Sequence, residues 1–394
     1  MTAGLSLEVV DSAARLDPQE WDALVEQARS PLFYRHGWLT AYEEAAPEEI
    51  AGFHYLLLRQ PDGGLGAGLP SYLVTSSPFW GGYAIESGFS DPLFSLPMLV
   101  SPCWYAFHTV LCSVLPLDQA LPLLLEALEG LARGRGTPLL AFPSVPEGHP
   151  LLPALLQRGF LAACIDAGHV CPQGRLSPGF DLKAFLGLIE GSERHDMVRR
   201  VRRSLEAGAR FSLELGPHLV DAFVALTDAT CRKHGIQPLY TTSLIDSLRR
   251  HLSSYLFFAN LQAEGRLLGG FLGFKERDLL YLWCGGIDID QLPRFSTYVV
   301  TFYHTLQWAM ESGCRVIDMG RGNHKFKMKH GFRPLRLYLC LKALDPSVSG
   351  RLPEFMARLE AGLGVPSTLE HLEARYGTFA TAFYAPRPGP GQPY

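Results

Sequence analysis

An internal repeat constrains the fold of this chain more than any other feature of its sequence. Residues of three types recur at a constant spacing of 203 positions: Leu65, Gly66, Leu69, Trp80 and Gly82 match Leu268, Gly269, Leu272, Trp283 and Gly285. Leucine and glycine are common in this chain, but both sets share a strand–turn–strand pattern that ends in Trp-x-Gly. The repeat predicts an internal duplication, in which two halves adopt the same fold.

The spacing of apolar residues predicts a mixed α/β chain with lobes at 1–178 and 179–385 and a tail at 386–394. The first lobe is expected to contain strands at 5–11, 53–60, 65–74, 138–142 and 160–171, and helices at 18–28, 36–44, 117–131 and 150–157. The second is expected to contain strands at 210–215, 255–263, 266–275, 279–283, 316–319 and 335–342, and helices at 192–207, 220–233, 242–252, 297–312 and 352–363. The tail is rich in proline and glycine, which predicts disorder.

Composition excludes several classes of protein. The 394 residues carry a net charge of −4, which argues against a protein that coats nucleic acid but allows a local basic patch. The eight cysteines show neither CxxC nor zinc-ligand spacing, so we expect reduced, buried thiols and no metal site. No apolar run approaches the roughly 18–20 residues that span a membrane, and no secretory signal pattern follows Met1. We expect a cytoplasmic protein.

The segment 316–334, VIDMGRGNHKFKMKHGFRP, carries the strongest chemical signal. A short apolar strand ends in Asp318, and two glycines follow at Gly320 and Gly322. Three lysines then alternate with other residues, at Lys325, Lys327 and Lys329. A glycine turn at the end of a strand allows a ligand to approach the backbone closely. Gly-x-Gly alone is too short for a dinucleotide-binding fingerprint, and the lysines lack the order of a P-loop.

The order of elements in the second lobe resembles the GNAT acyltransferase fold. Two such lobes in one chain resemble the Fem-type transferases, which build peptidoglycan bridges from aminoacyl-tRNA, and their acetyltransferase-like relatives. The matching residues are Asp318-x-Gly320-Arg321-Gly322 followed by Phe326-Lys327 and Gly331, together with a basic helix that opens the second lobe. The resemblance implies that the strands at 279–283 and 316–319 diverge and hold the acyl donor between them. Backbone N–H groups there would stabilise the developing oxyanion. Such acyl transfer needs no covalent nucleophile, consistent with the absence of a G-x-S-x-G elbow.

The conformation of the lysine segment decides what it can bind. If the segment is extended, Lys325, Lys327 and Lys329 share one face and can contact phosphates together. If it is helical, they scatter over roughly 200° and cannot all meet one ligand. A solvated lysine edge that discourages aggregation is the alternative to a binding role. We expect Lys327 to be the main site residue, and a solvated one, whose replacement by alanine lowers turnover much more than stability.

The helix that opens the second lobe contains five arginines within a stretch of ten residues. Helical spacing places Arg199, Arg200 and Arg203 opposite its apolar face, whereas Arg194 either precedes the helix or points toward a pocket. These four arginines are candidate contacts for donor phosphates, together with Lys325, Lys329, Gly320, Arg321 and Gly322. A simply solvated arginine face is the alternative.

His324, Asp318 and Lys327 are the candidate catalytic residues. His324, or His330 nearby, could accept a proton from an attacking amine, and Asp318 could do so or could bind backbone amides instead. Candidate acceptor-binding residues are Trp283, Gly285 and Asp288, of which Trp283 is also a natural core residue and Asp288 a natural loop residue.

These features predict an N-acyltransferase that moves an aminoacyl group from aminoacyl-tRNA to the amine of a small molecule or peptide. One alternative is a GNAT N-acetyltransferase that uses acyl-CoA, and another is a non-catalytic GNAT-like binding module. The donor would be a co-substrate, so we expect no permanently bound cofactor, and tRNA is the expected partner.

Overall fold

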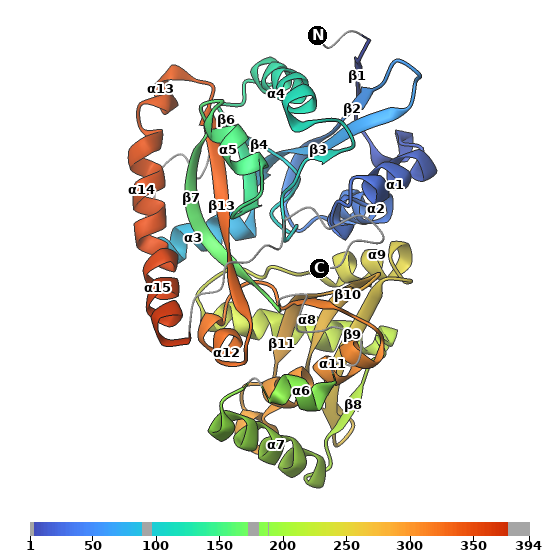
Figure 1. The fold of residues 1–394 in the computed structure, drawn as a ribbon, viewed down its shortest axis with the longest axis vertical. Helices are drawn as coiled ribbons and strands as arrows, with labels where there is room; N and C mark the ends of the chain where they lie inside the picture. Colours follow the sequence, from blue (N-terminus) through green and yellow to red (C-terminus); the bar gives the residue numbers. More distant parts are fainter. Residues whose placement is uncertain (1–3, 89–96, 172–180, 188, 377–394) are drawn as a thin grey trace. The chain divides into compact units, whose positions relative to one another are not determined.

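The computed structural model describes residues 4–88, 97–171, 181–187 and 189–376. The chain divides into two compact units (Figure 1). Unit 1 contains residues 1–166 and 336–367, and unit 2 contains residues 167–335 and 368–394. The lobe boundary expected at 178 and the tail expected at 386–394 lie outside the described residues.

Unit 1 is a mixed sheet with helices. Its elements are β1 (Ser6–Val10), α1 (Pro18–Gln27), α2 (His36–Ala45), β2 (Glu49–Arg59), β3 (Leu65–Ser76), α3 (Pro78–Ser87), β4 (Met98–Val100), β5 (Cys112–Ser113), α4 (Leu117–Gly134), β6 (Leu139–Pro146), α5 (Leu151–Leu156), most of β7 (Leu161–Val170) and of β13 (Arg333–Ala343), α13 (Pro346–Ser349) and α14 (Leu352–Leu363). Its strands lie in the order β1-β2-β3-β4-β6-β13, and β5 pairs with β3. All pairs in this order are antiparallel except β4 with β6.

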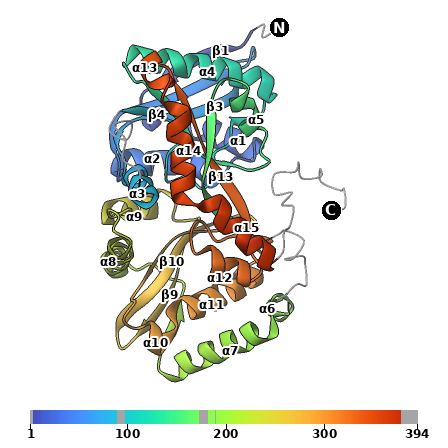
Figure 2. The ribbon, with the colours of Figure 1, turned by 90° about the vertical axis from the view of Figure 1, so that its left-hand side faces the viewer.

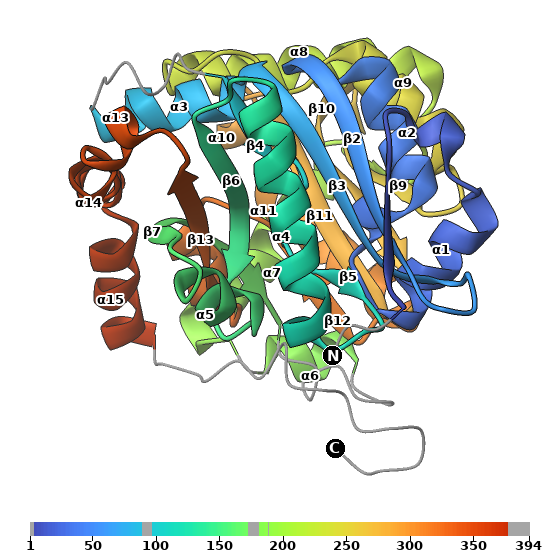
Figure 3. The ribbon, with the colours of Figure 1, turned by 90° about the horizontal axis from the view of Figure 1, so that it is seen from above.

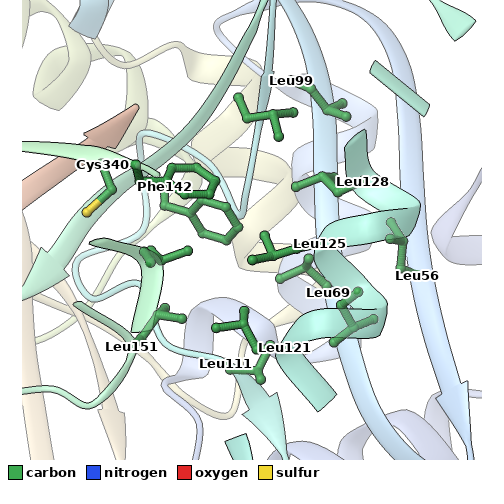
Figure 4. Packing of buried hydrophobic residues seen from close by; sticks show 14 of the residues in the cluster. Leu56, Leu69, Leu99, Leu111, Leu121, Leu125, Leu128, Phe142, Leu151 and Cys340 are labelled. Atoms are coloured by element: carbon green, nitrogen blue, oxygen red, sulfur yellow. The ribbon is translucent and has the colours of Figure 1, made fainter. Parts of the chain in front are cut away.

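The core of unit 1 lies beneath α4, which packs on β2 and β6 (Figure 3). Leu121, Leu125 and Leu128 recur at helical spacing and are almost fully buried, as a helix with one apolar face requires. They point toward Phe142 of β6 and Leu151 of α5 (Figure 4). Burial of each leucine contributes about 2 kcal/mol to folding.

A buried carboxyl group makes the stability of unit 1 depend on pH. Glu48 is 7% exposed and accepts a hydrogen bond from the Tyr42 hydroxyl. Burial raises the pKa of Glu48 to about 7, although hydrogen bonds from Ser77 and Tyr42 oppose this shift. A carboxyl whose pKa is higher in the folded state stabilises the fold most below its unfolded pKa, near 4.5.

We therefore expect the free energy of unfolding to fall by on the order of 3 kcal/mol between about pH 4.5 and 7 through Glu48. Urea titrations across this range measure the effect. Glu48→Gln, which stays neutral, should lose this part of the pH dependence. An unchanged pH dependence in that variant would rule out Glu48 as its source.

Unit 2 is a second mixed sheet with helices. Its elements are the end of β7, α6 (Leu182–Leu186), α7 (Gly191–Glu206), β8 (Arg210–Ser212), α8 (Pro217–Lys233), α9 (Thr242–His251), β9 (Leu256–Ala263), β10 (Arg266–Glu276), β11 (Leu279–Ile287), α10 (Leu292–Phe295), α11 (Thr297–Glu311), β12 (Val316–Asp318), α12 (His324–Lys329), the start of β13 and most of α15 (Val365–Tyr376). Its strands lie in the order β7-β12-β11-β10-β9-β8. As expected, β9, β10 and β11 form an antiparallel meander.

The two halves of the chain repeat the same order of elements. β1, α1, α2, β2 and β3 begin at residues 6, 18, 36, 49 and 65, and their counterparts β8, α8, α9, β9 and β10 begin at 210, 217, 242, 256 and 266. One expected match is wrong, because Trp80 and Gly82 lie in helix α3 whereas Trp283 and Gly285 lie in strand β11. The true counterpart of β11 is β4. β11 pairs antiparallel with β10 and parallel with β12, and β4 likewise pairs antiparallel with β3 and parallel with β6. The extra helix α3 precedes β4 and breaks the constant spacing.

Each unit takes its last strand from the other half of the chain. In unit 1, β6 pairs with β13, from Leu337 opposite Pro146 to Ala343 opposite Leu139. In unit 2, β12 pairs with the end of β7, where Asp318 lies opposite Val170. This exchange explains why residues 336–367 group with the first half of the chain, although they were expected in the second lobe.

All eight cysteines lie among the described residues and all are buried, as expected, and no disulfide joins them there. Within the described ranges no helix is both long and apolar enough to cross a membrane. The same residues contain no group of three histidine, cysteine or acidic side chains placed to hold a metal ion.

Candidate active site

The pairing of the two central strands of unit 2 ends where β12 ends. β11 and β12 pair in parallel at three positions, the last of which joins Tyr281 and Asp318. β12 ends there, whereas β11 continues to Ile287 while pairing with β10. The strands expected to diverge thus end their pairing at the residue that begins the glycine turn.

The turn after β12 is held from both sides. Gly320 and Gly322 both have φ of 66°, a left-handed conformation that glycine adopts without strain. An Asp318 carboxylate oxygen accepts a hydrogen bond from the Gly320 amide at 2.8 Å, so this aspartate binds backbone as one alternative predicted. The Lys327 ammonium donates to the carbonyl oxygens of Gly320 at 2.9 Å and Arg321 at 2.6 Å.

The lysine segment is helical, so the second of the two conformations considered above is present and the three lysines do not share one face. Lys325 is exposed, Lys327 is 2% exposed, and Lys329 forms an ion pair with Glu193 of α7 at 2.5 Å. The segment folds into α12 because Met328 packs into the core while Phe326 packs on α11. The expectation of a solvated Lys327 is wrong, since its charge lies inside the turn that it stabilises.

Two histidines meet beside this turn. His324 begins α12, and its Nδ1 lies 3.3 Å from Nε2 of His169, near the end of β7. The other ring nitrogen of His169 lies 3.2 Å from the Gly320 carbonyl oxygen. Burial, and then the Lys327 ammonium, lower the pKa of His169 well below its usual value, so its ring is neutral near pH 7. The sequence analysis missed His169, although an imidazole within a buried strand was a usable signal.

An aromatic cluster supports the exposed end of the turn. Tyr298, in the first turn of α11, packs edge-on against Phe326 with ring centroids 4.7 Å apart. Burial raises the pKa of Tyr298 to about 12, and a hydrogen bond with the side chain of Asn323 opposes this shift. Tyr298 is therefore a neutral hydroxyl beside the residue that ends the turn.

The three expected acceptor-binding residues have different surroundings. Trp283 is 3% exposed and packs edge-on against Tyr240, with centroids 4.9 Å apart. Gly285 is exposed, and Asp288 forms an ion pair with Arg266 at 3.3 Å.

Comparison with known proteins identifies this region. Residues 192–328 match the family model described as an acetyltransferase (GNAT) domain. The match runs from α7 to α12 and includes both diverging strands and the glycine turn. Residues 192–328 form a GNAT acyltransferase domain. A search of curated proteins finds no sequence that matches this chain.

Solved structures show that the tandem GNAT fold extends over most of the chain. FemX is similar with a TM-score of 0.57 and 12% identity, over 84% of this chain and 96% of FemX. A tandem GNAT protein from the clavulanic acid biosynthesis pathway has a TM-score of 0.52 and 13% identity, over 86% and 99% of the two chains. L-PGS from Bacillus licheniformis has a TM-score of 0.51 and 12% identity, over 88% and 97%.

A cationic groove lies on the GNAT domain beside α11. The groove has a volume of about 860 Å³ and is lined by residues of α6 and α7 and by Tyr303 of α11. The helices α6, α7 and α11 lie together in Figure 2. The apolar lining residues of the groove are Leu182, Leu186, Val198 and Tyr303. Its charged lining residues are Lys183, Arg194, Arg199 and Arg202, with His195, and no acidic side chain lines it within the described part of the chain.

The arginines of α7 divide into two groups. Arg194 lies within the helix and lines the groove, which agrees with the prediction that it points toward a pocket. Arg199 lines the groove as well. Arg200 does not line the groove and pairs with Asp196, which also pairs with the groove-lining Arg199. Arg202 pairs with Glu206, and Arg203 donates to the Pro293 carbonyl oxygen at 2.6 Å. In the described residues Lys183 and Arg194 have no ion-pair partner. These two cations are thus the ones most available to an anionic ligand.

Proposed function

We propose that this GNAT acyltransferase forms an amide bond by moving an aminoacyl group from aminoacyl-tRNA to the amine of a small molecule or peptide. The cationic groove is the observation that carries this choice of donor. A polynucleotide offers a longer row of phosphates to the groove cations Lys183, Arg194, Arg199 and Arg202 than CoA does. The apolar part of the lining, which includes Tyr303, suits an unstacked base at the end of a single strand.

The distribution of charge supports a polyanionic donor on unit 2. Unit 2 contains 24 lysines and arginines against 18 aspartates and glutamates, whereas unit 1 contains 11 against 21. The net charge of −4 therefore combines an acidic unit 1 with a basic unit 2. A field of this kind concentrates anionic ligands at the basic unit and raises their association rate.

The catalytic assignments follow from the geometry of the turn. Asp318 and Lys327 hold the backbone of the turn in place, and His324 stands at its exposed side, where it can accept a proton from the amine. Arg321, Gly322 and Lys325 flank the turn and would contact the donor, with Gly320 inside it. Trp283, Gly285 and Asp288 remain the proposed acceptor side, on the diverging strand β11 and the loop after it.

An acyl-CoA donor is the second candidate. The match of residues 192–328 to a model named for acetyltransferases favours it. The diphosphate of CoA would then contact the cations of the groove, and the activated bond would be a thioester instead of an ester.

A transfer assay with ribonuclease treatment separates the two donors. Purified protein is incubated with radiolabelled aminoacyl-tRNAs or acyl-CoAs, and with free amino acids and dipeptides as amine acceptors. We expect labelled amide from aminoacyl-tRNA, and its loss when the charged tRNA is digested first. Amide formation from acyl-CoA that persists after ribonuclease treatment, with none from aminoacyl-tRNA, would contradict the proposal.

A further inference from the structure

The exchanged strand β7 delivers a histidine to the GNAT domain from the first half of the chain. His169 is fully buried, and its backbone carbonyl accepts a hydrogen bond from the Met319 amide at 2.8 Å. Its ring lies between the glycine turn and His324, with the two imidazole centroids 5.0 Å apart. The side chain therefore bridges a fixed carbonyl and a half-exposed imidazole.

The contacts of His169 determine which of its nitrogens carries hydrogen. The Gly320 carbonyl oxygen can only accept a hydrogen bond, so His169 Nδ1 must be the donor. A second hydrogen on Nε2 would make the ring a cation, which burial and the adjacent Lys327 ammonium oppose. His169 Nε2 therefore carries a lone pair and accepts a hydrogen bond.

The same reasoning extends to His324. Because His169 Nε2 accepts, the hydrogen between the two rings belongs to Nδ1 of His324. A neutral His324 then has its lone pair on Nε2. Nε2 is the nitrogen that His169 does not occupy, and the His324 side chain is half-buried. The arrangement selects one tautomer of His324, as a proton acceptor requires.

We propose that His169 is the positioning residue that holds His324 in the Nδ1–H tautomer, so that His324 Nε2 takes the proton of the attacking amine. This inference rests on the proposed function. The amine nitrogen forms a bond to the acyl carbon, the ester C–O bond breaks, and the amine proton passes to His324 Nε2. The oxygen of the leaving group then takes that proton from His324 Nε2 and departs as a hydroxyl group. During transfer the imidazolium keeps its Nδ1–H bond to His169.

The charged groups around His324 are compatible with this role. The Lys327 ammonium opposes a second positive charge, but it is engaged by two backbone carbonyls of the turn. The Asp318 carboxylate faces the same turn through Gly320. The other histidine of this region, His330, directs Nδ1 to the Phe326 carbonyl oxygen at 2.6 Å and is 5% exposed, so it is badly placed for a substrate.

Two substitutions of His169 separate positioning from packing. In His169→Asn the amide nitrogen can keep the bond to Gly320 while His324 loses its acceptor. In His169→Gln the amide oxygen can replace Nε2 as that acceptor. We expect His169→Asn to lower kcat about 10-fold or more with KM for the donor unchanged. His169→Gln should retain most of the wild-type kcat. Loss of His324, in His324→Ala, should lower kcat about 100- to 10,000-fold.

The acid limb of the pH–rate profile should move to lower pH in His169→Asn, because the imidazolium of His324 loses its hydrogen-bond acceptor. Equal loss of kcat in the asparagine and glutamine variants, or an unchanged kcat in the asparagine variant, would overturn the proposal.

Nitrogen-15 NMR tests the tautomer without any substrate, so its outcome does not depend on the proposed function. In the wild-type protein we expect the His324 Nδ1 resonance of a protonated nitrogen and the Nε2 resonance of a bare one. In His169→Asn the two tautomers should mix. A wild-type His324 protonated at Nε2 would overturn the inference even if amide transfer is observed. If the expected tautomer is found but no amide transfer occurs, only the proposed function is contradicted.

Discussion

Replacement of Lys327 by methionine should lower the free energy of unfolding by about 2–4 kcal/mol. The ammonium of Lys327 is buried and donates to the carbonyl oxygens of Gly320 and Arg321. A hydrogen bond from a charged donor contributes about 1.5–3 kcal/mol, and a buried carbonyl left without its donor costs free energy in addition. Methionine keeps the length of the side chain, so little of the loss arises from a cavity.

Urea unfolding followed by intrinsic fluorescence measures this effect. The matched control is Lys325→Met, two residues away in the same helix, where an exposed lysine should contribute less than about 0.5 kcal/mol. Turnover should fall as well in Lys327→Met, because the turn that begins at the diverging strands loses its support. A variant that loses turnover at wild-type stability would show that Lys327 acts on the substrate and does not hold the turn.

The burial of Lys327 could not be predicted from its neighbours in sequence. Alternation of lysine with Phe326 and Met328 is compatible with an extended ribbon, and only a helix places Lys325 and Lys327 in different surroundings. The helix forms because Phe326 packs on Phe302 and Tyr298 of α11, residues that lie more than twenty positions earlier. Tertiary packing therefore decided the conformation that local pattern left open.

The elements of the sheet were predictable, but their partners were not. Apolar periodicity placed β9, β10, β11, α11 and the basic helix α7 close to their observed bounds. Periodicity carries no information about which strand lies beside which, so the exchange of β7 and β13 was not foreseen. His169 was missed for the same reason, because it is close to His324 only after the exchange.

The arginine helix was predictable as an amphipathic helix, and the face that lines the groove only in part. Arg194 falls on the apolar side of the helix by its spacing, which left open a position before the helix or one that points toward a pocket. The contributions of Lys183 and Arg202 depend on the packing of α6 and α11 beside α7, and these contacts are long-range.

Lys183 and Arg194, the two groove cations without an ion-pair partner among the described residues, should contribute strongly to donor binding. In Lys183→Ala/Arg194→Ala we expect the Kd for aminoacyl-tRNA to rise about 10- to 100-fold at low salt, because each contact of a cation with a phosphate is a charge-assisted hydrogen bond. Both side chains lie on the surface of helices, so stability should change by less than about 1 kcal/mol. Arg200→Ala is the control, since Arg200 pairs with Asp196 outside the groove.

The salt dependence of aminoacyl-tRNA binding tests the central claim, that the groove of unit 2 holds a polyanionic donor, most directly. The slope of log Kd against log salt is measured by filter binding for the wild type, the double variant and Arg200→Ala. Each lost phosphate contact should reduce the slope by about 0.7–0.9, so the double variant should lose about 1.5 and the control almost nothing. Equal slopes and equal affinities for all three proteins would contradict the claim.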